Sequence, residues 1–445
     1  MPKKKTKKFD DDVGYDIDSI FDEEEKASKL NSISVGTKLD PTTCLSSGIL
    51  CFDLISGGGL KAGSWYEIVG PESGGKTTAM YEAFNQALLY IPNSIKGLLL
   101  DVEGVLDYQW FSNITGVSSL KKIFGERDDD KGEWIIKPKI RYYKPAFGEM
   151  GLKFIRKTLK RMPDKVLVKD TWYYVFVPKM SKAAKKEDPE GGTKKLREKL
   201  KGRYNKNLFT QTGNLYVPVP NNYAGVELLI GIDSLASMTP EAISEDDSGA
   251  LGEQARMFGK YGNDIKSLIS KKGATLFGLN QIREKPMQLF GDPEYSPGGN
   301  TIKHCTDCRA RFSTVNVIGG KGPIEFEDDD EYRYCRVKTK KNKLFIPYQE
   351  TYFRWWVGHK GTSGFGSDPV MDTYRYLEMT GQVAKEGKHF RIDMKRFSKI
   401  KFTWSIFKGN ILGTSKKIKG NVRNFCIKQI MNGKGMDLYI KNISQ

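Results

Sequence analysis

A phosphate-binding pattern occupies residues 70–77, which read Gly-Pro-Glu-Ser-Gly-Gly-Lys-Thr and match G-x-x-x-x-G-K-[ST]. Its glycines let successive backbone N–H groups turn toward phosphate oxygens, and a helix that starts here adds the partial positive charge of its N-terminus. We expect Lys76 to reach the β- and γ-phosphates of a nucleoside triphosphate and the Thr77 hydroxyl to hold Mg²⁺. The pattern therefore predicts nucleotide binding, and an ordinary glycine-rich turn is the alternative.

Two carboxylates follow apolar runs elsewhere in the chain. Residues 228–233 read Leu-Leu-Ile-Gly-Ile-Asp and end on Asp233, and residues 98–103 end on Glu103. A P-loop enzyme needs a strand-end carboxylate near its metal ion and a group that orients water. Asp233 fits the first role, and Glu103 fits the second as general base. A strand that ends in Asp is also often a turn or capping residue, and that interpretation stays open.

The elements around these residues indicate an α/β fold. The phosphate pattern lies between an apolar strand at 65–69 and a helix at 76–90, and a second strand follows at 96–101. Strand, glycine-rich turn, helix and strand form a βαβ unit, which implies a parallel sheet. The remaining core elements are expected as strands at 227–233, 274–279 and 310–317, a helix at 252–270, and antiparallel strands at 332–338 and 352–357.

Length and composition exclude several classes of protein. The chain has 445 residues, and its hydrophobic fraction of 38% is enough to bury a substantial core. It contains no run of eighteen apolar residues, which excludes a transmembrane helix, and no apolar segment follows the basic residues 3–8 as a secretory signal requires. Six cysteines indicate a reducing compartment rather than a disulfide framework. The formal net charge of +18 favours an acidic partner, above all nucleic acid.

Two segments together hold the whole excess of positive charge. Residues 179–206 carry eleven Lys and Arg against four Asp and Glu, a net +7, and residues 391–445 carry a net +11. We expect the first to be a basic surface insertion and the second to belong to a small terminal domain with strand-like content at 402–407. Solvated, merely solubilising segments are the alternative for both. The aromatic residues of the second segment are expected in its core: Phe397, Phe402, Trp404, Phe407 and Tyr439.

These features together resemble the RecA family of homologous recombination ATPases. The phosphate loop differs from the bacterial RecA form at one position, Gly74, and residues 101–107 are similar to the family's catalytic-glutamate segment. In the same register Asp107 and Trp110 fall where the family contacts adenine. The resemblance implies a nucleotide-binding set of Gly70, Pro71, Glu72, Ser73, Gly74, Gly75, Lys76, Thr77, Thr78, Asp107, Trp110, Lys341 and Lys343. It implies the catalytic residues Glu103, Lys76 and Gln281, and the metal ligands Thr77 and Asp233.

The most specific likeness is the stretch 279–300. It resembles the family's γ-phosphate sensor, here Gln281, followed by its second DNA-binding loop without a change in length. Lys341 and Lys343 match two lysines that reach ATP across the family's subunit interface. A loop of this composition is expected to order when ATP and DNA are both bound, and to contact DNA without reading its sequence. The resemblance implies a DNA-binding set of Arg256, Arg283, Lys285, Met287, Leu289, Phe290, Gly298, Gly299 and Asn300.

Several positions depart from the family pattern. Asn263 and Asp264 stand where the family is basic, and His304 replaces an aromatic residue that is tied to filament cooperativity. The chain also ends in a basic segment where bacterial relatives end in an acidic tail. These departures indicate a divergent member of a bacterial RecA-like family, such as one encoded by a phage.

The resemblance implies an α/β P-loop ATPase core with a mostly parallel twisted sheet, a small N-terminal oligomerisation element and a C-terminal α/β lobe. The corresponding ranges are 1–45, a core over 46–365 that contains the 179–206 insertion, and a basic lobe over 366–445. The implied function is a DNA recombinase that uses ATP and Mg²⁺, forms a helical filament on single-stranded DNA and exchanges strands with a homologous duplex.

The resemblance also implies partners and a location in the cell. Single-strand-binding and loader proteins are expected partners, and a membrane is not. The expected location is the cytoplasm or nucleoid of a bacterium or of a phage-infected host. Because rings and filaments share this core, a ring-forming P-loop DNA motor such as a helicase is one alternative. A non-catalytic DNA-coating scaffold is the other.

Overall fold

The structure is a computed structural model that describes residues 44–444 apart from internal gaps. The gaps are residues 92, 105, 129, 132, 169–170, 178–193, 195–208, 212, 220–224, 242–249, 285–293, 316–331, 357–365 and 415–417. The described residues all belong to one compact unit, residues 41–445. The predicted N-terminal element, residues 1–45, lies outside the described residues except for Cys44 and Leu45.

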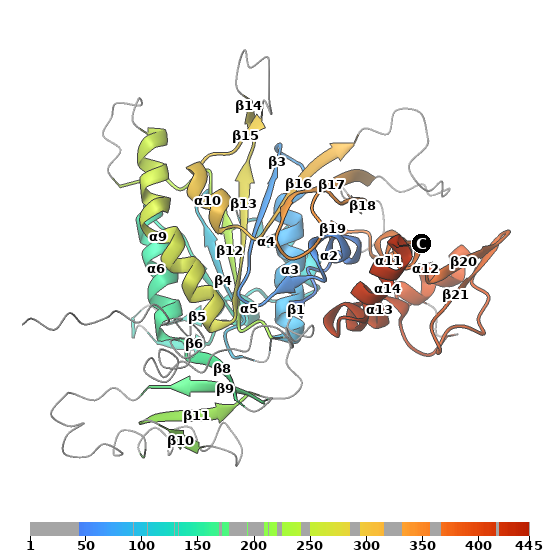
Figure 1. Cartoon of the computed structure of the whole chain (residues 1–445), viewed down its shortest axis with the longest axis horizontal. Helices are drawn as coiled ribbons and strands as arrows, with labels where there is room; N and C mark the ends of the chain where they lie inside the picture. Colours follow the sequence, from blue (N-terminus) through green and yellow to red (C-terminus); the bar gives the residue numbers. More distant parts are fainter. Residues whose placement is uncertain are drawn as a thin grey trace, which may run out of the picture. The chain divides into compact units, whose positions relative to one another are not determined.

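A nine-stranded sheet forms the centre of this unit (Figure 1). Six of its strands run parallel, in the spatial order β16 (Cys308–Val315), β3 (Trp65–Gly70), β13 (Ala274–Gln281), β12 (Leu228–Asp233), β4 (Gly97–Asp101) and β7 (Ile140–Tyr143). Three antiparallel strands continue the sheet beyond β16: β17 (Tyr332–Asn342), β18 (Glu350–Trp356) and β19 (Gly366–Ser367). The sheet confirms the predicted α/β class, the mostly parallel order and the antiparallel continuation.

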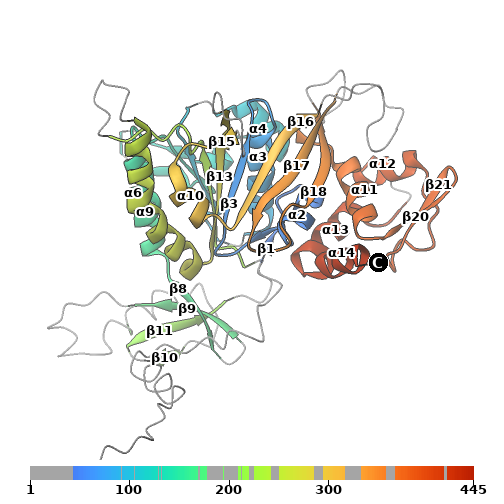
Figure 2. The ribbon, with the colours of Figure 1, turned by 45° about the horizontal axis from the view of Figure 1, so that its top comes forward.

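Helices cover both faces of the sheet, because its central strands carry apolar side chains on both sides (Figure 2). On β12, Leu229 packs into one buried cluster and Ile230 into the other. The first cluster includes residues of α2 (Leu50–Ser56) and α3 (Lys76–Tyr90), and the second includes residues of α6 (Gly148–Arg161), α9 (Ala250–Lys272) and α10 (Gly299–Cys305). Helix α3 begins and ends at the residues that the sequence predicts.

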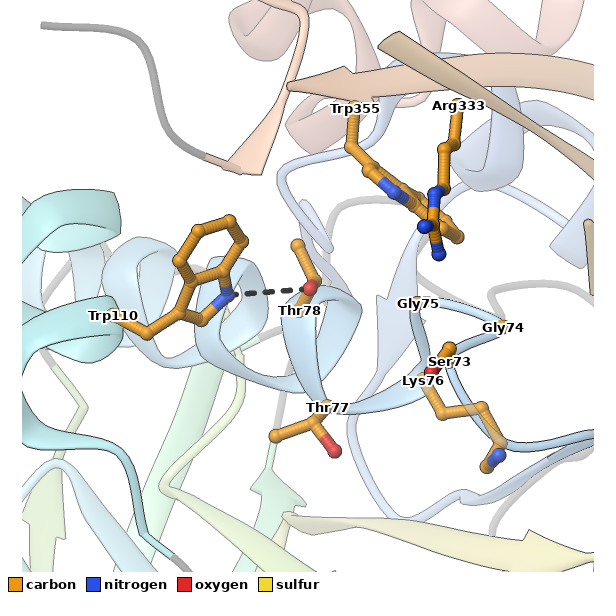
Figure 3. A pocket seen from close by; sticks show the side chains of 9 residues that line it. All are labelled: Ser73, Gly74, Gly75, Lys76, Thr77, Thr78, Trp110, Arg333 and Trp355. Carbon is orange, nitrogen blue, oxygen red and sulfur yellow. Dashed lines mark hydrogen bonds between the residues drawn. The ribbon is translucent and has the colours of Figure 1, made fainter. Parts of the chain in front are cut away.

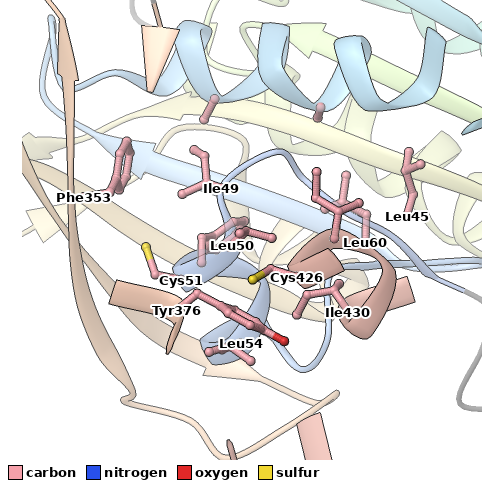
Figure 4. Close-up of a cluster of buried hydrophobic side chains, with 14 of the residues drawn as sticks. Leu45, Ile49, Leu50, Cys51, Leu54, Leu60, Phe353, Tyr376, Cys426 and Ile430 are labelled. Atoms are coloured by element: carbon pink, nitrogen blue, oxygen red, sulfur yellow. The ribbon is translucent and has the colours of Figure 1, made fainter. Parts of the chain in front are cut away.

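The C-terminal residues share a hydrophobic core with α2. Side chains of Tyr376, Cys426 and Ile430 pack around Leu50 and neighbouring residues of that helix (Figure 4). The elements of this region are α11 (Pro369–Met379), β20 (Val383–Glu386), β21 (His389–Ile392), α12 (Trp404–Ile411), α13 (Val422–Met431) and α14 (Lys434–Ile443). The two short strands pair with each other as a hairpin.

The predicted strand-like character of 402–407 is wrong. Phe402 makes only an isolated bridge to Phe390, and α12 begins at Trp404 because the Thr403 hydroxyl accepts the N–H of Ile406 at the start of the helix. The predicted core role of the aromatic residues is confirmed. Little or no surface is exposed on Phe397, Phe402, Phe407 and Tyr439, and Trp404 is partly buried against the same cluster.

A buried ion pair joins the C-terminal helices to the start of the core. The Arg423 guanidinium donates to Asp372 Oδ2 at 2.7 Å and to the Gly48 carbonyl at 2.5 Å. The same carboxylate accepts the backbone N–H groups of Leu50 and Cys51 at 2.8 and 3.1 Å, so it caps α2 from outside. Asp372 exposes no surface, and its charge therefore depends on these partners.

Four strands outside the main sheet form a separate antiparallel sheet. Their order is β10 (Phe209–Gln211), β11 (Asn214–Pro218), β9 (Thr171–Phe176) and β8 (Asp164–Val168). The predicted basic insertion, residues 179–206, connects β9 to β10 and, apart from Lys194, lies outside the described residues. The sequence predicted the insertion but not the strands on either side of it.

The remaining short elements are β1 (Cys44–Leu45), β2 (Leu60–Lys61), α4 (Tyr108–Thr115), α5 (Lys121–Phe124), β5 (Glu126–Arg127), β6 (Trp134–Ile136), β14 (Arg283–Glu284) and β15 (Glu294–Tyr295). No helix in the described part of the chain is long and apolar enough to cross a membrane.

The Arg423–Asp372 pair yields a test of stability. We predict that Arg423→Ala lowers the free energy of unfolding by about 3–5 kcal/mol, because it leaves a buried carboxylate without its cation. The matched control is Arg391→Ala, whose partner Glu386 and whose own side chain are both more than 40% exposed, and which should cost less than about 1 kcal/mol. Urea denaturation followed by circular dichroism measures both. Equal losses would contradict the role given to the buried pair.

Candidate functional site

The phosphate loop joins the end of β3 at Gly70 to the start of α3 at Lys76. Gly75 caps the helix with a φ of 79°, a conformation that favours glycine. A Cβ on Gly75 would lie 1.9 Å from the ring of Trp355, so the loop and the β18 side chain are packed directly on each other. The strand–loop–helix setting that the motif requires is present.

Lys76 and Thr77 face the edge where the parallel strands end. The Lys76 ammonium donates to the carbonyls of Gly70 and Pro71 at 3.0 and 2.6 Å, and its burial lowers its pKa. The Thr77 hydroxyl donates to Asp233 Oδ2 at 3.0 Å. A hydroxyl beside a carboxylate matches the oxygen ligands that Mg²⁺ prefers, so this pair could hold the metal ion of a bound nucleotide.

Burial raises the pKa of Asp233 to about 6, and repulsion from Glu103 adds to the shift, while the Thr77 hydrogen bond opposes it. The negative charge at this buried strand end is therefore unfavourable without a nearby cation. A divalent cation would offset that cost, which agrees with a metal-binding role.

Glu103 lies on the turn that follows β4. The hydroxyls of Ser234 and Ser237 both donate to its Oε1, at 2.6 and 2.8 Å. Asp101 shapes the turn, because its carboxylate accepts the N–H groups of Gly104 and Leu106 at 2.7 and 3.0 Å. The two serines were not predicted, although Ser234 directly follows Asp233 in the sequence.

A cavity of about 300 Å³ opens on the outer side of the loop (Figure 3). Trp110 forms part of its wall, and its indole N–H donates to the Thr78 hydroxyl at 3.3 Å. Asp107 does not line the cavity but caps α4 by accepting the Trp110 N–H at 2.8 Å. The cavity is lined by Ser73, Gly74, Gly75, Lys76, Thr77, Thr78, Trp110, Arg333 and Trp355.

Arg333 and Trp355 were missed from the sequence. They are directly paired across β17 and β18, which lie two and three places from β3 in the sheet. No local pattern marks them, since only the strand order brings them to the loop. A tryptophan on either side of the cavity suits the stacking of a flat base, and Arg333 adds positive charge beside it.

The predicted sensor Gln281 ends β13 and pairs in register with Gly70, the first residue of the loop. Its neighbour Asn280 is fully buried, and its side-chain amide donates to Glu67 Oε1 at 2.8 Å and to the Pro297 carbonyl at 3.1 Å. The hairpin β14–β15 follows, with Arg283 paired to Tyr295. The segment between these strands, residues 285–293, lies outside the described residues, with Lys285, Met287, Leu289 and Phe290 in it.

The other predicted DNA-binding residues lie near this hairpin or on α9. Gly298 and Gly299 adopt φ angles of 96° and 72° at the start of α10, and Asn300 is exposed beside them. Arg283 is exposed on β14. Arg256 is exposed on α9, where it pairs with Glu253 one turn before it.

Lys341 and Lys343 do not line the cavity of their own chain. Their ammonium groups donate to the carbonyls of Lys303 and His304 near the C-terminal end of α10. Their role toward a neighbouring subunit stays a prediction.

Part of the chain is similar to proteins of known family. Residues 218–361 match the family model described as the RecA N-terminal domain. This part of the chain is therefore similar to the RecA family. The matched segment contains Asp233, Gln281, Lys341, Lys343 and Trp355.

Individual RecA proteins are similar to the chain at modest identity. It is 30% identical over 169 residues to protein RecA of Thermus aquaticus, which covers 38% of this chain and 46% of that protein. It is 27% identical over 384 residues to the chloroplastic DNA repair protein recA homolog 1 of Arabidopsis thaliana, which covers 86% of this chain and 64% of that protein. Protein RecA of Aquifex aeolicus is 30% identical over 169 residues, 47% of its length. The matches thus span about half to two thirds of these relatives.

The packing of the phosphate loop yields a second test. We predict that Gly75→Ala lowers the affinity for MgATP by about tenfold or more, because the new Cβ would displace the loop from the Trp355 ring. The control is Gly116→Ala, whose φ of 65° imposes a comparable backbone strain but whose Cβ would meet nothing within 4 Å. Isothermal titration with a non-hydrolysable analogue measures both. A loss of affinity in the control alone, or in both equally, would contradict the contact.

Proposed function

We propose that this chain is a RecA-type, ATP-dependent DNA recombinase. It forms a helical filament on single-stranded DNA and catalyses homologous pairing and strand exchange, with ATP and Mg²⁺ as cofactors. The observation that carries the proposal is the short distance along the chain from the phosphate loop's partner strand β13 to the hairpin β14–β15. The predicted second DNA-binding loop lies between the strands of that hairpin. Gln281 pairs with Gly70. The side-chain amide of its neighbour Asn280 donates to the carbonyl of Pro297, which follows the hairpin's second strand.

The roles of the nucleotide-site residues follow from their positions. Thr77 and Asp233 would hold Mg²⁺, which neutralises phosphate charge when it is bound with ATP. Lys76 would leave the loop carbonyls for the β- and γ-phosphates. Trp110 and Trp355 would enclose the base.

Glu103 is suited to act as general base. Both serine hydroxyls donate to its Oε1, so the carboxylate is held in one orientation and Oε2 can accept a proton from the attacking water. Gln281 would contact the γ-phosphate and report its presence to the loop. Lys341 and Lys343 would reach ATP from a neighbouring protomer.

Self-assembly has support from an apolar stripe formed by Phe147, the N-cap of α6, and two residues of that helix. Phe147, Met150 and Phe154 lie at helical spacing and expose 38%, 41% and 36% of their surfaces. Exposed apolar residues that line up on one helix face are typical of a contact between subunits. We propose a contact between copies of this chain here, with single-strand-binding and loader proteins as further partners, in the cytoplasm or nucleoid of a bacterium or phage-infected cell.

Homologous pairing tests the proposed function. With ATP, Mg²⁺, an oligonucleotide and a homologous supercoiled duplex, the chain should form joint molecules. Lys76→Ala should reduce their yield about a hundredfold or more, because it removes the cation that the phosphates require. The control is Lys131→Ala, an exposed lysine on the turn between β5 and β6, which should leave the yield unchanged.

Two outcomes would overturn the proposal. Joint molecules that form equally well with Lys76→Ala would disconnect pairing from the nucleotide site. Closed rings rather than filaments, in electron micrographs of the chain with ATP and single-stranded DNA, would favour a motor of the helicase type.

A further inference from the structure

The cavity beside the phosphate loop has a cation in its wall to which the proposed function gives no role. Its described lining residues include two cations, Lys76 and Arg333, and none of these lining residues is acidic. Such a lining attracts negative charge, and the N-terminus of α3 adds to the attraction. Lys76 already has a proposed role at the β- and γ-phosphates, so Arg333 requires a separate explanation.

Strand pairing fixes the place of Arg333. It lies on β17 directly opposite Trp355 of β18, and paired residues on one face of an antiparallel sheet have Cβ atoms about 5 Å apart. The Trp355 ring packs on the loop, since a Cβ on Gly75 would meet it at 1.9 Å, and on Phe353, whose ring centroid is 5.7 Å away. Trp355 is only 5% exposed. Arg333 is therefore anchored beside a well-packed contact with the end of the loop.

The Arg333 guanidinium and the Lys76 ammonium lie at different ends of the loop. Figure 3 shows the Arg333 side chain extending from its strand toward Gly75. The Lys76 ammonium instead donates to the carbonyls of Gly70 and Pro71, where the loop begins. Both side chains line the same cavity, so an anion bound there would meet a cation on each side.

The place of Arg333 indicates which phosphates it would reach. Gln281, the proposed γ-phosphate sensor, pairs in register with Gly70 at the start of the loop. Arg333 lies toward Gly75 at its end, where α3 begins. We therefore expect the γ-phosphate near the start of the loop and the α- and β-phosphates near its end. A guanidinium presents parallel N–H groups that suit two phosphate oxygens, so Arg333 is placed to bind the diphosphate.

We propose that Arg333 binds the α- and β-phosphates of the nucleotide within the same chain that provides the phosphate loop. This inference rests on the proposed function and extends it. Because ADP keeps both of these phosphates, the contact persists after the γ-phosphate is hydrolysed. Arg333 therefore slows the release of ADP, whereas Gln281 responds to the phosphate that ADP lacks.

Binding of MgADP to the purified full chain tests this contact. We expect Arg333→Gln to raise the dissociation constant about tenfold, because a charge-assisted hydrogen bond to phosphate is lost. Displacement of a fluorescent ADP analogue in a stopped-flow instrument should show the change mainly as faster release. The dissociation constant of a non-hydrolysable ATP analogue should rise by the same factor, since the γ-phosphate is not involved. Arg333→Lys keeps the charge without the planar fork and should lose less affinity.

A matched control and a direct readout make the result specific. Arg336→Gln removes a cation of the same strand that pairs with Glu350 at 2.6 Å and does not line the cavity, and it should leave both affinities unchanged. Phosphorus NMR of bound ADP should show shifted α- and β-phosphate resonances in Arg333→Gln. Unshifted resonances despite weaker binding would assign the guanidinium to the base and overturn the proposal.

The remaining outcomes distinguish this inference from the proposed function. An unaltered chain that binds neither ADP nor the ATP analogue would overturn both. If the unaltered chain binds them, an unchanged ADP affinity in Arg333→Gln would overturn the inference alone. A loss confined to the ATP analogue, or an equal loss in Arg336→Gln, would overturn it as well.

Discussion

One buried amide connects the two halves of the proposed machinery. Asn280 donates through its side-chain nitrogen to the Glu67 carboxylate and to the Pro297 carbonyl, and its oxygen accepts the backbone N–H of Gln281. Glu67 exposes no surface, and Arg309 provides its cation at 3.1 Å. A buried charge of this kind tolerates few arrangements, because each lost partner costs several kcal/mol. Strand β13, which ends beside the phosphate loop, and the base of the proposed second DNA loop are therefore held in one network.

The same network reaches the loop from a second direction. Arg309 on β16 also donates to the Ser296 hydroxyl at 2.7 Å, one residue before Pro297. β16 and β13 flank β3, which leads into the phosphate loop. A shift of Gln281 toward a γ-phosphate would thus act on a hairpin whose following residues are hydrogen-bonded to both neighbours of β3. Asn280 of β13 contacts Pro297, and Arg309 of β16 contacts Ser296. This arrangement gives the proposed link between ATP and DNA a physical basis in the hydrogen bonds of Asn280 and Arg309.

The sequence could predict the parts of the site that depend on short stretches of chain. The phosphate loop, helix 76–90 and the strand ends at Asp233 and Gln281 follow from local patterns, and the parallel order then brings Asp233 to Thr77. Arg333 and Trp355 reach the loop only through the order of β16, β17 and β18, which no local pattern encodes. The strands around the insertion were missed because its basic composition dominates that region. At 402–407 the alternating apolar residues suggested a strand, but the Thr403 cap and the burial of Phe407 and Ile411 favour a helix.

The proposed function requires that nucleotide chemistry and DNA binding are coupled in this chain. The most direct measurement is the rate of ATP hydrolysis by the purified protein, with and without single-stranded DNA, at fixed Mg²⁺ and low salt. We expect a low rate without DNA and a rate at least about tenfold higher with saturating DNA, since the ordered loop would complete the site around Gln281. Equal rates in the two conditions would contradict the coupling.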